Sequence, residues 1–383
     1  MLKIYLTFLI IFFLLTPNAG AIYDPLFLPN NKFGIHIIDE NDLVSAAHLV
    51  NSSGGDWGYV TMVITQEDRK LNKWTTNFEL MTKLHLTPII RIATALSGSM
   101  WKTPSISEID IWADFLDELP WPVKNRYVII YNEPNHAKEW GGKIDPEGYA
   151  EILGIFSQKL KEKSEDFFIL PAGIDASAPD SRETMDEVQF IKRMLASKPD
   201  IIEKIDGWTS HSYPNPNFKG KVTDQGRGTI ANYVWEVELL KTFGIEKRLP
   251  VFISETGWPH NQNNPLNSNL LTPDDVAENI QKADEQIWQD KNIVLVSPFL
   301  LNYQSVLFAN FSWKKMNSED FYPQYDAYRS IAKTKGQPVL AQKSPTVGPK
   351  VDFGNIKGET AQNINKNTNL LLSVWSFLKK FFT

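Results

Sequence analysis

The sequence predicts an α/β protein of the (β/α)8 (TIM) barrel class. Between about residues 32 and 335, short β-rich runs alternate with longer amphipathic stretches, and eight such strand-plus-helix units follow one another. A doubly wound open sheet would normally carry a glycine-rich phosphate turn, and neither GxGxxG nor GxxxxGK(S/T) occurs. A chain of 383 residues with 42% hydrophobic residues can bury a core of that size.

The β-rich runs predict the eight barrel strands at residues 32–38, 57–64, 88–92, 127–132, 167–172, 207–213, 250–254 and 294–302. Helices are predicted between them, for example at 41–50, 145–163, 184–196, 230–243 and 273–288. At the last of these helices Thr272 can cap the amino end and Pro273 takes the first helical position. We therefore place one barrel domain at residues 22–335.

The two ends of the chain differ from the barrel in composition. Residues 1–21 combine Lys3, an apolar stretch and small residues, which predicts a signal peptide and a secreted or cell-envelope protein. An uncleaved N-terminal anchor is the alternative. Residues 336–369 are polar and rich in proline and glycine, which predicts a linker or disordered tail. Residues 370–383 form a short amphipathic segment that either docks on the barrel or associates with a membrane surface.

Composition excludes several kinds of chemistry. The chain has no cysteine, so disulfides, thiol catalysis and zinc–thiolate sites are excluded. Its six histidines form no HExxH pattern and no cofactor fingerprint occurs, so we expect neither a metal nor a cofactor. The net charge of −6 is spread along the chain without a basic stripe, which argues against nucleic acid as a partner. Catalysis is therefore expected to depend on carboxylates.

Two glutamates close predicted strands of the barrel. Glu133 follows the fourth run, in the stretch YNEPN, and Glu255 ends the seventh, in VFISETGWP. Because the carboxyl ends of barrel strands form the active face, we expect the two carboxylates to face each other. Such a pair suits glycosidic bond cleavage, in which one group protonates the leaving oxygen and the other attacks or stabilises the sugar cation. A separation of about 5–5.5 Å corresponds to retention of configuration.

The two motifs together resemble clan A of the glycoside hydrolases, which are retaining enzymes on a (β/α)8 barrel. SETGWP is most similar to family 17 and NEP to families 5, 39 and 53, and the resemblance extends over residues 32–335. It implies that Glu133 is the acid/base, that Glu255 is the nucleophile, and that Asn132 hydrogen-bonds the sugar 2-hydroxyl. It also implies that Tyr213, in SHSYP, orients the nucleophile and that His211 lines the site.

Other side chains are candidates for binding the sugar. Arg91, at the end of the third run, either steadies a catalytic carboxylate or pairs with a structural acid. Trp258 and Trp313 follow strands and could pack on pyranose rings, although tryptophans also serve as packing residues. His36 and Asp175 are pocket candidates that an interior polar layer would explain equally well.

The sequence therefore predicts a secreted retaining glycoside hydrolase that acts on a β-linked glycan or glycoside. Transglycosylation uses the same two carboxylates and stays open. A barrel that binds glycans without turnover is the alternative from another class.

Overall fold

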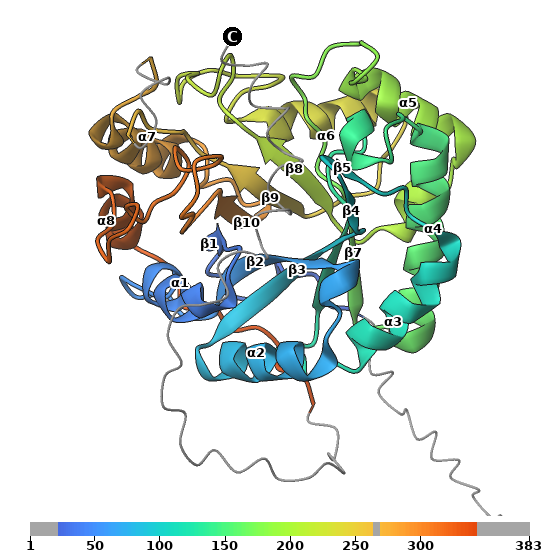
Figure 1. Ribbon diagram of the computed structural model, residues 1–383, viewed down its shortest axis with the longest axis horizontal. Helices are drawn as coiled ribbons and strands as arrows, with labels where there is room; N and C mark the ends of the chain where they lie inside the picture. The colour runs from blue at the N-terminus through green and yellow to red at the C-terminus, as the bar shows by residue number, and fades with distance from the viewer. Residues whose placement is uncertain (1–21, 263–268, 343–383) are drawn as a thin grey trace, which may run out of the picture.

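The computed structural model describes residues 22–262 and 269–342, and these residues form a (β/α)8 barrel (Figure 1). The barrel strands are β1 (Gly34–His36), β2 (Gly58–Thr65), β3 (Leu86–Ala93), β6 (Arg126–Ile130), β7 (Phe167–Pro171), β8 (Trp208–Ser212), β9 (Val251–Thr256) and β10 (Ile293–Pro298). The helices around them are α1 (Leu43–Val50), α2 (Leu71–Lys83), α3 (Ile109–Asp117), α4 (Pro146–Lys163), α5 (Glu187–Ser197), α6 (Asn232–Thr242), α7 (Pro273–Gln286) and α8 (Pro323–Ser330). A small hairpin of β4 (Leu96–Ser97) and β5 (Met100–Trp101) extends the loop after β3.

The barrel closes through two junctions between a five-stranded and a three-stranded parallel sheet, with strand orders β1-β2-β3-β6-β7 and β10-β9-β8. At one junction Phe33 forms a parallel bridge with Val296, whose amide donates to the Lys32 carbonyl over 2.8 Å. At the other, the Thr209 hydroxyl of β8 donates to the Pro171 carbonyl of β7 over 2.5 Å. β6 and β9 therefore belong to different sheets, and their ends face each other only because the barrel closes.

Alternate residues of the strands fill two cores. Aromatic rings of Tyr59, Tyr127, Phe168 and Phe252 pack together inside the barrel, with centroids 4.9 to 6.2 Å apart. Residues of the opposite parity, such as Val128, pack outward against the helices. The inner aromatic layer belongs to the amino-terminal part of the strands, so an open site has room only at their carboxyl ends.

The predicted start of α7 is confirmed. The Thr272 side chain accepts from the Asp275 amide (3.1 Å), and the Asp275 carboxylate accepts from the Thr272 amide (3.0 Å), which forms a capping box. The end of the eighth predicted strand is wrong, because β10 stops at Pro298 instead of continuing to residue 302.

The first residues of the predicted linker belong to the barrel. The Lys124 amide donates to the Val339 carbonyl (2.8 Å), and Leu340 forms an antiparallel bridge with Val123. The predicted boundary after residue 335 is therefore wrong, and the domain extends at least to Ala341, whose amide donates to the Pro122 carbonyl over 3.2 Å. The predicted signal peptide, the rest of the linker and the segment 370–383 lie outside the described residues. Within the described ranges, no helix is long and apolar enough to cross a membrane.

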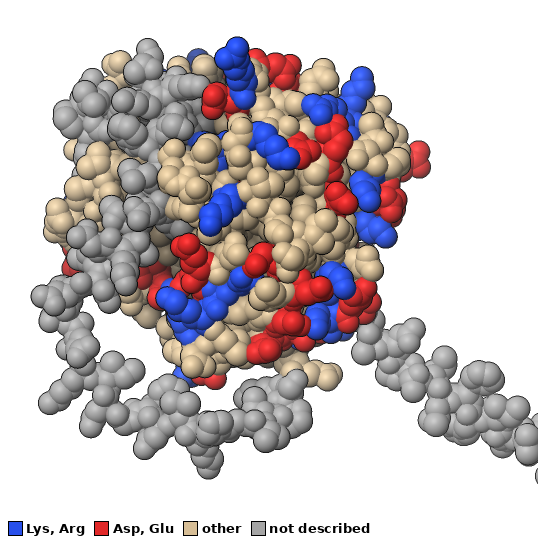
Figure 2. Space-filling view, turned by 45° about the vertical axis from the view of Figure 1, so that its right-hand side comes forward, with Lys and Arg blue, Asp and Glu red and all other residues tan. Residues whose placement is uncertain are grey.

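Charges of both signs alternate on the face over α3, α4 and α5 (Figure 2). Neighbouring helices are joined there by ion pairs, namely Lys159 with Asp110 (3.2 Å), Lys163 with Asp114 (2.5 Å) and Arg193 with Glu147 (2.7 Å). Exposed pairs of this kind contribute little to stability, because water and salt screen them. This face therefore presents a mixed field instead of a surface of one sign.

Candidate active site

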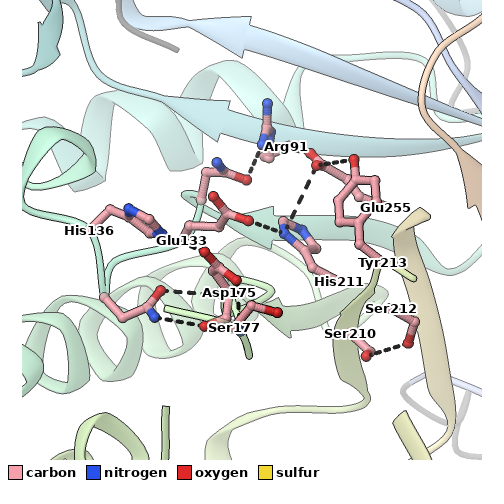
Figure 3. A network of polar contacts seen from close by, with 12 residues as sticks. Arg91, Glu133, His136, Asp175, Ser177, Ser210, His211, Ser212, Tyr213 and Glu255 are labelled. Atoms are coloured by element: carbon pink, nitrogen blue, oxygen red, sulfur yellow. Dashed lines mark hydrogen bonds and ion pairs between the residues drawn. The ribbon is translucent and has the colours of Figure 1, made fainter. Parts of the chain in front are cut away.

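Two carboxylates meet at the carboxyl end of the barrel (Figure 3). Glu255 lies within β9, and Glu133 is the third residue after β6. His211 of β8 lies between them, with Nδ1 2.8 Å from Glu133 Oε1 and 3.9 Å from Glu255 Oε2. The side chains of Glu133 and Glu255 are 10% and 12% exposed. The structure thus brings the two predicted glutamates into one partly open site.

Glu255 reaches this site because β9 is irregular at Ser254. Phe252 faces the inner core and Ile253 the outer one, so in a regular strand Glu255 would share the outward face of Ile253. The pairing with β8 jumps from Ser210 opposite Ile253 to His211 opposite Glu255, which leaves one residue of β9 unpaired. Such a bulge re-aims the side chain that follows it, and here it turns Glu255 into the barrel.

The chain after β6 is also irregular. Tyr131 and Glu133 have φ angles of 68° and 30°, in a region that L-residues rarely adopt. The Tyr131 ring is anchored outward, edge-on against Trp140 and Phe156 at 5.8 Å each. The Glu133 amide donates to the Gly173 carbonyl over 3.1 Å, which ties the turn to the end of β7. Strained backbone of this kind, at about 1–3 kcal/mol per residue, is typical of functional sites.

Glu255 is held as a carboxylate. Arg91 Nη1 donates to Oε1 and the Tyr213 hydroxyl donates to Oε2, both over 3.1 Å. Burial alone would raise the pKa of Glu255, but the charges of His211 and Arg91 and the hydrogen bond from Tyr213 together lower it. Burial lowers the pKa of His36 to about 3, so this imidazole, 4.0 Å from Glu255, is a neutral neighbour.

Glu133 and His211 share a hydrogen bond that can hold a proton. Burial alone would lower the pKa of His211, but the nearby charges of Glu255 and Glu133 raise it. A proton on this contact can sit on the imidazole or on the carboxyl group. Gly173 packs directly against the imidazole, since a Cβ at that position would lie 2.2 Å from His211 Cδ2. The glycine therefore makes room for the ring that joins the two glutamates.

A buried network holds the loop that carries Glu133. His136 Nε2 lies 2.9 Å from Asp175 Oδ2, and the Ser177 amide donates to Asp175 Oδ1 over 2.8 Å. The Asn135 side-chain amide donates to the Asp175 carbonyl over 3.0 Å. Burial alone would raise the pKa of Asp175, but the hydrogen bond from His136 lowers it. This network joins the loops after β6 and β7, so Asp175 has the role of an interior polar residue.

Four predicted binding residues lie in the site. His211 and Tyr213 contact the glutamates as described above, and Arg91 hydrogen-bonds both Glu255 and the Asn132 side-chain oxygen. Of the two interpretations of Arg91, the structure favours contact with a site carboxylate. Within residues 22–262 and 269–342, no cluster of His, Asp or Glu side chains is arranged to hold a metal ion.

The two predicted tryptophan platforms lie in the core instead. Trp258 and Trp313 are each 2% exposed. Trp258 Nε1 donates to the Gly220 carbonyl over 3.0 Å, and Trp313 packs edge-on against Tyr328 at 5.3 Å. Neither ring offers a face to a ligand, so the prediction that they bind the sugar is wrong in this structure. Large apolar side chains fill the core around a barrel, and Trp258 and Trp313 are two of them.

Sequence reasoning missed three residues of the site. Phe299, directly after β10, is half-buried and lies edge-on to His36 at 5.2 Å. It was hidden inside the run that was predicted to continue to residue 302. His136 and Gly173 were also missed, although His136 lies only three residues after Glu133 and Gly173 directly follows a strand run. Position at a strand end was the signal that could have found Gly173, whereas Phe299 lay inside the predicted run and carried no such signal.

Comparisons with known proteins relate the chain to others by its fold. No protein-family model and no curated protein sequence matches it. It is similar to the structure of a GH39 β-xylosidase from Caulobacter crescentus, with a TM-score of 0.51 and 12% identity over 82% of this chain and 74% of that one. A family 51 α-L-arabinofuranosidase from Bifidobacterium longum gives a TM-score of 0.52 and 10% identity over 85% and 77% of the two chains. A fungal β-1,4-galactanase gives a TM-score of 0.52 and 11% identity over 76% and 90%.

These neighbours are clan A glycoside hydrolases, which confirms the predicted barrel class and the predicted resemblance. At identities of 10% to 12%, the likeness concerns the fold. Any statement about chemistry must therefore come from the site itself.

Proposed function

We propose that this protein is a glycoside hydrolase that acts by double displacement with retention, Glu133 being the acid/base and Glu255 the nucleophile. The observation that carries the proposal is the unequal environment of two neighbouring carboxylates. Arg91 and Tyr213 keep Glu255 ionised, whereas Glu133 contacts an imidazole that can hold a proton. A nucleophile needs the first environment and an acid needs the second.

The spacing of the two groups supports retention. His211 Nδ1 is 2.8 Å from Glu133 Oε1 and 3.9 Å from Glu255 Oε2, so these oxygens are no farther apart than the sum of the two distances. Retaining glycosidases place their carboxyl groups about 5–5.5 Å apart, and inverting ones about 6.5–9.5 Å apart. The upper bound falls at the lower edge of the inverting range, which leaves little room for a water between Glu255 and the sugar.

The reaction then has two halves. A Glu255 oxygen attacks the anomeric carbon, the bond to the leaving oxygen breaks, and that oxygen takes the proton held by Glu133 and His211. This leaves a glycosyl ester on Glu255 and an ionised Glu133. Glu133 next takes a proton from a water molecule, whose oxygen attacks the anomeric carbon and releases Glu255. Tyr213 and Arg91 hold the Glu255 carboxylate in the orientation for attack and receive it again at the end.

The substrate class follows from the site and the fold neighbours together. The neighbours include a β-xylosidase, an α-L-arabinofuranosidase and a β-1,4-galactanase, so the first substrates to examine are aryl glycosides of these sugars and of glucose. The apolar stretch at residues 1–21 supports a place outside the cytoplasm for the reaction, and export is part of the proposal.

The proposal is tested by turnover of this panel and by chemical rescue. Glu255→Ala should abolish hydrolysis, and azide should restore cleavage of an activated β-glycoside with formation of the α-glycosyl azide. The matched control is Glu147→Gln, which removes an exposed carboxylate on α4 and should keep wild-type activity. Wild-type turnover by Glu255→Ala would disprove the assignment. Binding of glycans without turnover by the wild-type protein would identify a binding barrel instead.

A further inference from the structure

A third carboxyl group lies beside the two catalytic ones and has no role in the proposed reaction. Glu139 ends the short 3-10 helix η4 (Ala137–Glu139), six residues after Glu133, and is 7% exposed. Among the described residues its carboxyl group makes neither a hydrogen bond nor an ion pair. Burial raises the pKa of Glu139, although the charges of Lys138 and Arg91 oppose this. A polar group at this depth is destabilising unless a partner is supplied.

Glu139 borders a small cavity at the edge of the active site. The cavity has a volume of about 40 Å³ and is lined by Glu139, Arg91, Asn132, Trp101 and Thr94, among others. Arg91 and Asn132 are the side chains that hydrogen-bond each other, and Arg91 also holds Glu255. The cavity therefore adjoins the place where a sugar must lie if Glu255 is to attack it.

The size of the cavity limits what it can hold. A buried water needs about 10–15 Å³ of such volume, so the space suits about three or four waters or one substituent of a sugar ring. A whole pyranose ring is too large. Arg91 and Glu139 both line the cavity, so a neutral hydroxyl group placed there would find a donor and an acceptor within the same lining.

We propose that this cavity receives one neutral hydroxyl-bearing substituent of the sugar bound at Glu133 and Glu255, and that Glu139 hydrogen-bonds it. This inference rests on the proposed function and adds a specificity-determining residue to it. A carboxyl group suits the task because sugar hydroxyls both donate and accept hydrogen bonds. Selection arises because a sugar without that hydroxyl would leave the buried carboxyl group unpaired.

The test compares the effect of one protein variant on kcat/KM for a substrate with its effect for analogues of that substrate, in the manner of a double-mutant cycle. Glu139→Gln keeps the shape of the side chain, and the probes are the best aryl glycoside of the panel and its analogues with one sugar hydroxyl removed each. The variant should lower kcat/KM on the parent by about 10- to 100-fold, as expected for loss of a hydrogen bond to a charged group. On the one analogue that lacks the bound hydroxyl, the same variant should lower it by no more than about twofold. A purely structural role would lower kcat/KM equally on every analogue.

Binding without turnover separates this inference from the proposed reaction. In Glu255→Gln, calorimetric Kd values for the same probes are compared with and without Glu139→Gln, and Glu147→Gln is the matched control. Hydrolysis by the wild type with equal losses on all analogues would overturn the inference and leave the reaction intact. If the wild type hydrolyses no probe, but Glu139→Gln weakens binding of the parent glycoside and not of the analogue that lacks one particular hydroxyl, the proposed reaction would be overturned and the subsite supported. Neither binding nor hydrolysis of any probe would overturn both.

Discussion

The fold brings glutamates together in two places, on opposite sides of β8. Glu133 and Glu255 lie on its inner side, next to His211. Glu187 of α5 and Glu236 of α6 lie behind it, and both are 0% exposed. In the inner pair, each carboxylate has a hydrogen-bond donor of its own. In the outer pair, none of the four carboxyl oxygens makes a hydrogen bond of regular geometry with the described residues.

The pKa of Glu255 is shifted in the opposite direction from those of the outer pair, because cations lie next to Glu255. Burial raises the pKa of Glu187 and of Glu236, and the charge of Glu236 raises that of Glu187 further. Burial acts on Glu255 too, but the charges of His211 and Arg91 outweigh it. Two buried carboxyl groups side by side therefore keep protons unless a cation stands next to one of them. Proximity of acids alone does not make a catalytic pair, and the cation that ionises one member separates their roles.

The largest difference between the pairs is expected in turnover. Glu133→Gln should lower kcat on a glycoside with a poor leaving group by about 10²- to 10⁴-fold, the usual contribution of a general acid. Glu187→Gln removes a carboxyl group that is equally buried but behind β8, so it should change kcat by no more than about threefold. The measurement is kcat on aryl glycosides with leaving groups of graded pKa. An equal loss in both variants would break the comparison.

The next largest effect, on kcat/KM, concerns the His211 imidazole, which lies between Glu133 and Glu255. Gly173→Ala would place a Cβ 2.2 Å from His211 Cδ2 and must displace the imidazole. We expect about a 100-fold loss in kcat/KM, since catalytic groups tolerate little misplacement. Gly154→Ala on α4 is the matched control, because its Cβ would meet only Ile201 Cδ1, at 3.6 Å. Similar kinetics for the two alanine variants would show that the position of His211 does not matter.

Some features of the site could be predicted from the sequence, and others could not. Glu133 and Glu255 were found because strand runs are local patterns and barrel strands display chemistry where they end. The inward direction of the Glu255 side chain could not be predicted. It depends on the bulge at Ser254, which arises from pairing with β8, far away in the sequence. Strict alternation from Ile253 would have pointed this carboxylate at the helices.

The predictions about aromatic residues were wrong for a related reason. Trp258 follows Glu255 by three residues and looks like a wall for the sugar, yet its indole donates to Gly220 and is buried. Whether a ring faces a ligand or the core depends on what the neighbouring loops cover, and those contacts are long-range. Phe299 is the opposite case. It was predicted to lie inside a strand, whereas its half-buried ring lies beside His36 in the site.

A moderate effect is expected on the pH dependence. The charges of Glu255 and Glu133 raise the pKa of His211, although burial opposes them, so the contact between Glu133 and His211 keeps its proton to higher pH. In His211→Asn the proton must sit on Glu133 alone, and the basic limb of kcat/KM should move to lower pH. Loss of the charged contact should also reduce kcat/KM near neutral pH about tenfold. A pH profile that stays in place or moves upward would contradict the role of His211 in holding the proton.

The smallest effect is one of stability and belongs to the outer pair. The pKa of Glu187 is raised above that of an unfolded glutamate, about 4.3, so its contribution to folding is complete below that pH and is lost as the pH rises toward the folded value. Relative to Glu187→Gln, the wild-type free energy of unfolding should fall above that pH by up to about 1.4 kcal/mol per pH unit. Glu147 gives the opposite sign, because the hydrogen bond from Arg193 lowers its pKa and its contribution disappears in acid. Urea unfolding of the wild type and Glu187→Gln at pH 5 and pH 8 measures the sign for Glu187, and unfolding of the wild type and Glu147→Gln at pH 3 and pH 5 measures the sign for Glu147. A wild-type free energy of unfolding that does not fall relative to Glu187→Gln between pH 5 and pH 8 would show that the outer pair holds no proton in the folded state.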